Sequence, residues 1–238
     1  EENAGSDVSD LESSARRGSS LTRQLLTFAR KNETLVEPVN VNALIEETME
    51  MFRRSVTREI EIRPALTREI ATVSGDGGQI QQAILNLLLN ARDAMPDGGA
   101  LTISTVITTA DAHTTSRFSS VRPGPFVMIR IEDTGMGIPS HLHNRIFEPF
   151  YTTKDNGTGL GLSVVYGVVQ NHGGFINMES SPGKGTAFEV FFPRATATAS
   201  AAARKRRRAL PRGSERILII DDEVSVSEIA RDMLTGLG

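Results

Sequence analysis

Apolar positions recur every three or four residues along four stretches of the chain, and they alternate along several shorter ones. The longer spacing predicts helices over residues 7–31, 41–55, 78–95 and 160–171. Alternation or short apolar runs predict strands at residues 60–62, 71–74, 101–107, 125–132, 175–180 and 186–192, and a short helix is expected near 140–147. This order predicts an α/β fold: a two-layer α/β sandwich with a mixed sheet covered by helices on one face, preceded by one long helix.

The helix at 78–95 is apolar over most of its girth, which is typical of a buried helix. Its polar residues form one stripe, because spacings of 3, 4, 4 and 3 return to the same face of a helix. The stripe consists of Gln79, Gln82, Asn86, Asn90 and Asp93. Taken alone, it favours satisfied core amides or a half-exposed face over a surface that meets metal and phosphate, since buried amides need polar partners.

The helix at 7–31 has an apolar stripe that it cannot bury by itself. It either packs on the following domain or forms half of a helical hairpin that dimerises into a bundle, and the pattern leaves both open. Residues 32–38 are typical of a linker that ends at Pro38.

The C-terminal part of the chain changes character at residue 195. Residues 195–214 are low in complexity and include a basic run, which predicts a solvated linker. Residues 215–238 begin with a buried strand that ends in Asp221 and Asp222. Two carboxylates at a strand end suit a hard cation such as Mg2+, although they could equally cap a helix.

Composition excludes only a few classes of protein function. The apolar content of 39% supports an ordinary core, and the net charge of −3 argues neither for nor against a nucleic-acid partner. Since cysteine is absent, disulfides, thiolate metal sites and a Cys nucleophile are excluded. The chain has no apolar run of about 18 residues and no signal peptide, so we expect no membrane contact by this chain. The pattern is open at both ends, which we interpret as a fragment of a longer protein.

Three glycine-rich segments follow the polar stripe. Asp133 and the next glycines could accept a hydrogen bond from a ligand amine, and GTGLGL at 157–162 opens a helix whose free N–H groups could bind an anion. GKGT at 183–186 lies in a predicted hairpin. None of the three fits a P-loop or a dinucleotide-binding motif.

Taken in order, these segments resemble the catalytic ATP-binding domain of bacterial sensor histidine kinases, whose superfamily includes gyrase, the ninety-kilodalton heat-shock chaperones and the mismatch-repair ATPases. The resemblance covers residues 40–194 and rests on five motifs: NLLLNARDAM resembles the N box, DTGMGI the first glycine box, IFEPFYTTK the F box, GTGLGLS the second glycine box and GKGTAFEVFFP the last. RRGSSLTRQLLTFAR resembles the second helix of the dimerisation bundle, and ILIIDDE the start of a receiver domain.

The resemblance implies roles for individual residues toward ATP and Mg2+. Asn90 would hold the Mg2+ with Asn86 close by, Asp133 would accept from the adenine amino group, and Lys154 would add charge from a lid at 139–158. The implied catalytic residues are Asn86, Asn90 and Lys154, and the implied nucleotide-binding residues are Asn90, Asp93, Asp133, Gly135, Gly137, Ile138, Lys154, Gly157, Thr158, Gly159, Leu160, Gly161, Leu162 and Thr186. Arg92 is expected either to reach phosphate or to be a solvated surface residue. Phe147 and Phe150 are expected to anchor the lid on the core.

The resemblance also implies a domain plan. Residues 1–37 would be the second bundle helix, 38–194 the ATP-binding domain, 195–214 a linker, and 215–238 the start of a receiver domain with Asp221 and Asp222 as Mg2+ ligands. The full protein would be a cytoplasmic hybrid histidine kinase that forms a homodimer and works with a receiver or response-regulator domain. Any membrane anchor would belong to a preceding region.

The expected activity is transfer of the ATP γ-phosphoryl group to a histidine that this chain lacks. None of the four histidines has the sequence context of the family's acceptor: His113, His141, His143 and His172. In superfamily members that hydrolyse ATP, a Glu occupies the position of Asn86, and an amide cannot act as a general base. The alternatives are a superfamily ATPase, a Ser/Thr-directed kinase of the anti-sigma type, or a non-catalytic scaffold.

Overall fold

The computed structural model describes residues 36–56, 59–111, 121–154, 157–195 and 231. All of these except Arg231 belong to the first of two compact units, Glu1–Ser200 and Ala201–Gly238. The predicted helix at 7–31, the strand before Asp221 and Asp222, and all but the first residue of the linker at 195–214 lie outside the described residues.

The described part is an α/β sandwich, as predicted. Its elements are, in order, β1 (Glu37–Asn40), α2 (Val41–Arg53), β2 (Ile60–Ala65), β3 (Thr72–Gly75), α3 (Gly77–Asp93), β4 (Gly99–Ala110), β5 (Gly124–Asp133), a 3-10 helix (Ser140–Leu142), α5 (Gly161–Asn171), β6 (Phe175–Ser180) and β7 (Thr186–Pro193). Five strands form a sheet in the order β2-β4-β5-β7-β6. Only the β2–β4 pair is parallel, so the sheet is mixed.

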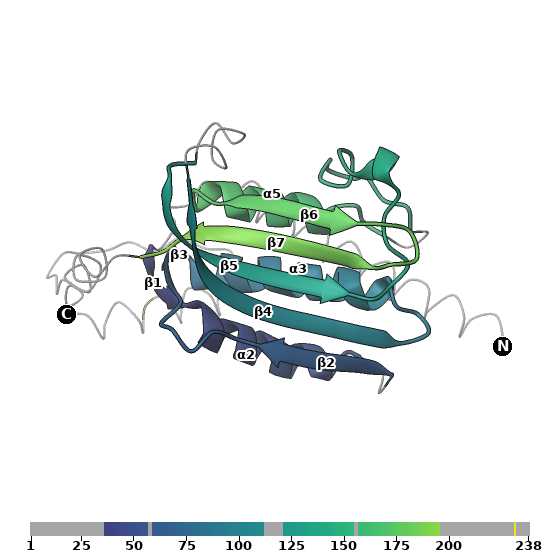
Figure 1. The fold of residues 1–238 in the computed structure, drawn as a ribbon, viewed down its shortest axis with the longest axis horizontal. Coiled ribbons are helices and arrows are strands. Elements are labelled where there is room, and N and C mark those ends of the chain that lie inside the picture. The colour runs from purple at the N-terminus through teal and green to yellow at the C-terminus, as the bar shows by residue number, and fades with distance from the viewer. Residues whose placement is uncertain (1–35, 57–58, 112–120, 155–156, 196–230, 232–238) are drawn as a thin grey trace, which may run out of the picture. The chain divides into compact units, whose positions relative to one another are not determined.

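Three helices, α2, α3 and α5, cover one face of this sheet (Figure 1), with α3 packed against both of the others. The core lies between the two layers. Alternate residues of β4 and β5 point into it, among them Leu101, Ile103, Ile129 and Ile131, all at most 1% exposed. Arg130 lies between Ile129 and Ile131 on β5, and its side chain pairs with Glu189 on β7 at 2.6 Å.

Side-chain caps begin two of the helices. The Asn40 carboxamide oxygen accepts from the backbone N–H groups of Asn42 and Ala43, and the Asp76 carboxylate accepts from Gln79 N–H at 3.1 Å. Such caps satisfy N–H groups that lack a partner within the helix. They fix where α2 and α3 start.

Two sequence expectations need correction. Residues 37 and 38, expected to end a linker, instead begin a strand, β1, which pairs antiparallel with β3 as a second, two-stranded sheet. Pro38 is tolerated because an edge strand can dispense with one N–H donor. The expected helix near 140–147 is a single 3-10 turn over Ser140–Leu142 followed by further turns.

Candidate nucleotide-binding site

The polar stripe on α3 lies where the periodicity placed it. Asn86 and Asn90 are half-buried, whereas six apolar residues of the same helix are at most 3% exposed. These buried residues are Ile80, Ala83, Ile84, Leu87, Leu88 and Ala91. The stripe is therefore a half-exposed face with contacts of its own.

Asp133 ends β5 with its side chain almost fully enclosed. The residue is 4% exposed, and its Oδ1 accepts a hydrogen bond from Gly135 N–H at 2.8 Å. Burial raises the pKa of this carboxyl above its ordinary value, although hydrogen bonds from the backbone N–H groups of Gly135 and Thr186 oppose the rise. A buried carboxylate with few donors around it is a strong acceptor for a ligand amine.

The first and last glycine segments meet at the end of β5. A Cβ added to Gly185 would lie 1.9 Å from the Asp133 carbonyl oxygen, and one added to Gly137 would lie 2.0 Å from the Ser181 carbonyl oxygen. Both glycines also have positive φ, +84° and +69°. Only glycine combines that backbone with so close an approach. A Cβ on Gly135 would similarly meet Ala94 O at 2.4 Å, so this strand end lies against the end of α3.

Ser180 joins these two segments, a role that sequence reasoning missed. Its hydroxyl accepts from Ile138 N–H at 2.7 Å and lies 2.8 Å from the Thr186 hydroxyl. Thr186 itself is 4% exposed, and Ile138 packs against the core. The alternating pattern placed Ser180 at the end of β6, but nothing local in the sequence marks its partners.

The second glycine segment leads into α5 beside the stripe. Gly159 has a φ of +67°, Thr158 accepts from Leu160 N–H at 3.4 Å, and Leu160 is buried. The Asn86 carboxamide donates to the Gly161 carbonyl at 3.3 Å. A Cβ on Gly161 would lie 3.7 Å from Asn90 Nδ2. The start of α5 therefore adjoins both asparagines of the stripe.

The C-terminal end of the lid leads into the start of α5. Gly157 leaves no room for a Cβ, which would lie 2.2 Å from the Thr152 hydroxyl, and Leu162 packs against the core. No side chain among the described residues caps the N-terminus of α5. Its first-turn N–H groups thus form a site suited to an anion.

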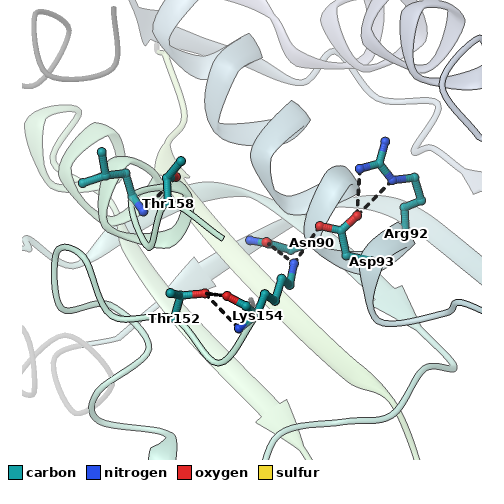
Figure 2. A network of polar contacts seen from close by, with 7 residues as sticks. Asn90, Arg92, Asp93, Thr152, Lys154 and Thr158 are labelled. Carbon is teal, nitrogen blue, oxygen red and sulfur yellow. Dashed lines mark hydrogen bonds and ion pairs between the residues drawn. The ribbon is translucent and has the colours of Figure 1, made fainter. Parts of the chain in front are cut away.

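A cluster of charged side chains lies beside Asn90 (Figure 2). The Lys154 ammonium lies 2.8 Å from Asp93 Oδ2 and 3.3 Å from Asn90 Oδ1. Arg92 binds the other oxygen of Asp93 at 2.7 Å. Partial burial acts to raise the pKa of Asp93, but hydrogen bonds and charge from Lys154 and Arg92 outweigh it and lower the pKa below its ordinary value. Both expectations for Arg92, a phosphate contact and a solvated surface residue, stay predictions.

The oxygens of Asn90 and Asp93 converge on one cation, here the lysine ammonium. Amide and carboxylate oxygens are also ligands of Mg2+, which usually takes one or two protein ligands and completes its shell with phosphates and water. The described residues contain no group of three or more Asp, Glu, His or Cys that could hold a metal alone. The side chains present thus fit a metal delivered with a nucleotide.

Of the two phenylalanines expected to anchor the lid, one does so. Phe147 packs against Tyr166 and Phe188, with ring centroids 5.8 and 6.5 Å away. The expectation for Phe150 is wrong, because its side chain is 62% exposed and its φ is +67°. Its backbone lies against Gly159, where a Cβ would come within 2.3 Å, so the backbone makes the close contact and the ring points away from the core.

Residues 75–196 match the family described as histidine kinase-, DNA gyrase B- and HSP90-like ATPases. Sensor kinase CckA of Brucella abortus (strain 2308) is 38% identical over 92% of this chain and 24% of its own length. Sporulation kinase A of Bacillus subtilis (strain 168) is 38% identical over 72% of this chain and 26% of its own length. The chain thus spans about a quarter of these curated relatives.

Solved structures show the same fold. Full-length ShkA in complex with AMPPNP has a TM-score of 0.65 and 28% identity, over 81% of this chain and 39% of that one. The mycobacterial sensor histidine kinase MprB has a TM-score of 0.55 and 29% identity, over 67% of this chain and 97% of that one. Within the described residues, no helix has the length and apolarity needed to cross a membrane.

Family match, relatives and fold agree with the arrangement of the stripe, the buried carboxylate and the glycine segments. The chain belongs to the histidine kinase-, DNA gyrase B- and HSP90-like ATPase family and contains a bacterial histidine kinase catalytic domain, which binds ATP.

Proposed function

We propose that this chain is the ATP-binding catalytic part of a two-component sensor histidine kinase. It transfers the γ-phosphoryl group of ATP to a histidine that is not one of the four in this sequence. One observation carries the proposal: α3 adjoins Asp133 through the contact of Gly135 with Ala94, and it adjoins the start of α5 through Asn86. A nucleotide bound between these two ends would pass along Asn90 and Asp93.

The chemistry at each end fits one part of ATP. The buried Asp133 carboxylate accepts from the adenine amino group, with Gly135, Gly137, Ile138 and Thr186 shaping the space around the base. At the other end, the backbone N–H groups of residues 157–162 face the phosphates. Mg2+, which supplies charge neutralisation for phosphoryl transfer when bound, would be held by Asn90.

Lys154 adds a flexible positive charge to this site. Its ammonium already lies beside Asn90 and Asp93, so it is within a side chain's reach of the proposed phosphate position. Position 86 carries an amide, which cannot activate water as a general base. This favours transfer to a protein side chain over hydrolysis, and so favours a kinase over a superfamily ATPase.

The wider assembly is part of the same proposal. The chain would work as a homodimer through a helical bundle that includes residues 7–31, and would pass phosphate to a receiver or response regulator. A structural neighbour, histidine kinase ThkA, was solved in complex with the response regulator TrrA, with 25% identity and a TM-score of 0.59. Asp221 and Asp222 would be Mg2+ ligands of a receiver domain, and the protein would act in the cytoplasm.

The test has two arms. Calorimetric titration of Mg-ADP and a non-hydrolysable Mg-ATP analogue into this chain should show binding that weakens with Asp133→Ala and loses its Mg2+ dependence with Asn90→Ala. A histidine-bearing bundle helix from a relative, added in trans with Mg-ATP, should then gain acid-labile phosphate. Acid-stable phosphate would identify a Ser/Thr-directed kinase, and release of inorganic phosphate without phosphoprotein would identify an ATPase. Absence of nucleotide binding would support the scaffold.

A further inference from the structure

The inference concerns Asn86 and rests on the proposed function. Its carboxamide nitrogen lies 3.3 Å from the carbonyl oxygen of Gly161, the first residue of α5. A carbonyl oxygen only accepts hydrogen bonds, so the amide must turn its NH2 group toward Gly161. The side chain thus acts here as a donor to backbone, whereas a metal ligand would act through its oxygen.

Among the described residues, two side-chain hydrogen bonds join α5 to the region of α3, and this is one of them. At the other end of α5, His172 Nε2 accepts from the backbone N–H of Asp76, the N-cap residue of α3, at 3.0 Å. The His172 Nδ1–H donates to Val168 O at 2.7 Å, which fixes the ring. The C-terminal end of α5 is therefore held by His172, and the N-terminal end by Asn86.

The N-terminal end needs such a tie more than the other. It has no side-chain cap among the described residues, and Gly159 and Gly161 give the segment before it little stiffness of its own. Its free N–H groups must nevertheless hold a fixed position relative to Asn90 if both are to contact one phosphate chain. Preorganised donors lose less entropy on binding than donors that must be ordered.

We infer that Asn86 is a positioning residue and not a metal ligand. It holds the start of α5 at a fixed distance from Asn90 by donating to Gly161 O, so that the backbone N–H groups of the second glycine segment are preorganised for the nucleotide phosphates. The amide is required for its NH2 group. A carboxylate of the same shape would set two acceptors against each other, with the Gly161 carbonyl facing an anion.

Asn86→Asp separates the two roles, because aspartate keeps the oxygen that a metal needs and loses the donor that Gly161 needs. In calorimetry, Asn86→Asp and Asn86→Ala should both weaken the non-hydrolysable Mg-ATP analogue by about tenfold, the worth of one hydrogen bond of ~1.4 kcal/mol. Adenosine affinity and the Mg2+ concentration at half-maximal enhancement should stay at their wild-type values. Asn90→Asp is the matched control: it retains an oxygen for Mg2+ and should keep the metal dependence.

Amide hydrogen exchange tests the positioning without nucleotide. Val164 N–H closes the first turn of α5 on Leu160 O at 3.0 Å. In Asn86→Asp its exchange should be at least about fivefold faster, while Val169, near the His172 end, should be unchanged. This arm stands even if the wild-type chain binds no nucleotide, a result that would overturn the proposed function.

Three results would overturn the inference. One is Asn86→Asp binding the triphosphate analogue as the wild type does, which would make the oxygen the required atom. Another is an increased Mg2+ requirement in Asn86→Ala, which would make Asn86 a metal ligand. The third is a failure of local positioning itself. Unchanged exchange at Val164 in Asn86→Asp would mean that Asn86 does not position α5, and loss of adenosine binding together with the triphosphate analogue would mean general destabilisation.

Discussion

Asp133→Asn should separate nucleotide binding from stability at a single position. Asparagine has the same shape, keeps one oxygen with two lone pairs that can accept from the Gly135 and Thr186 N–H groups, and replaces the other oxygen with an NH2 group. The new NH2 group would face the adenine amino group, so that two donors meet. Because residue 133 is only 4% exposed, water cannot supply the missing acceptor. Losing a hydrogen bond to a charged group costs about 1.5–3 kcal/mol, so Mg-ADP affinity should fall by about 10- to 150-fold.

The same change should not destabilise the free protein at neutral pH. Burial raises the pKa of the Asp133 carboxyl, so the ionised form is less favourable in the folded chain than in the unfolded one. That cost is fully present above the folded pKa and absent below the unfolded pKa. Asp133→Asn removes it, so its free energy of unfolding should equal or exceed that of the wild type at pH 7. Any advantage should shrink as the pH falls into the carboxyl range.

The assays are calorimetric titration with Mg-ADP and urea unfolding at pH 7 and pH 4. Asp97→Asn, at an exposed position, removes the same charge from the surface and is the matched control. It should leave Mg-ADP affinity within about twofold, since an exposed charge interacts weakly. The reasoning is refuted if Asp133→Asn binds Mg-ADP like the wild type, or if it loses more stability at pH 7 than at pH 4.

Three further changes test other parts of the site. Lys154→Met should weaken binding of the triphosphate analogue more than binding of Mg-ADP, and equal losses for both nucleotides in calorimetry would contradict this. Because the ion pair of Lys154 with Asp93 is exposed, the change should alter the free energy of unfolding by less than about 1 kcal/mol. Gly183→Ala should cost about 1–2 kcal/mol, because Gly183 has a positive φ. Gly185→Ala should destabilise far more, because a Cβ there would also collide with backbone, and equal urea midpoints for the two variants would refute this. His172→Ala should lower the free energy of unfolding by about 1–3 kcal/mol by leaving Asp76 N–H without its acceptor, and a smaller loss in His172→Gln would be consistent with that bond.

The fold could be predicted wherever a segment's own pattern decides its structure. Six strands and three helices of the described part follow from apolar spacing, because burial of one face imposes that spacing. β1 could not be found this way. It is four residues long, contains Pro38, and exists because Val39 and its neighbours pair with β3, more than thirty residues away. Pairing between distant short segments leaves no local period to detect.

In the site, too, local spacing predicts some features and misses those that depend on distant segments. The stripe on α3 was predictable because all its members share one helix, but their partners come from segments about sixty to seventy-five residues further on, as in the bonds of Asn86 to Gly161 and of Lys154 to Asp93. The glycines carry the missing signal in part. Gly137 and Gly185 each mark a place where one backbone touches another, since a Cβ at either would lie within about 2 Å of a carbonyl oxygen. A glycine therefore records that a close approach occurs without recording which segment approaches. For that reason the prediction of the site rests on the order of the motifs, which ties each glycine segment to its place in a known fold, and not on spacing alone.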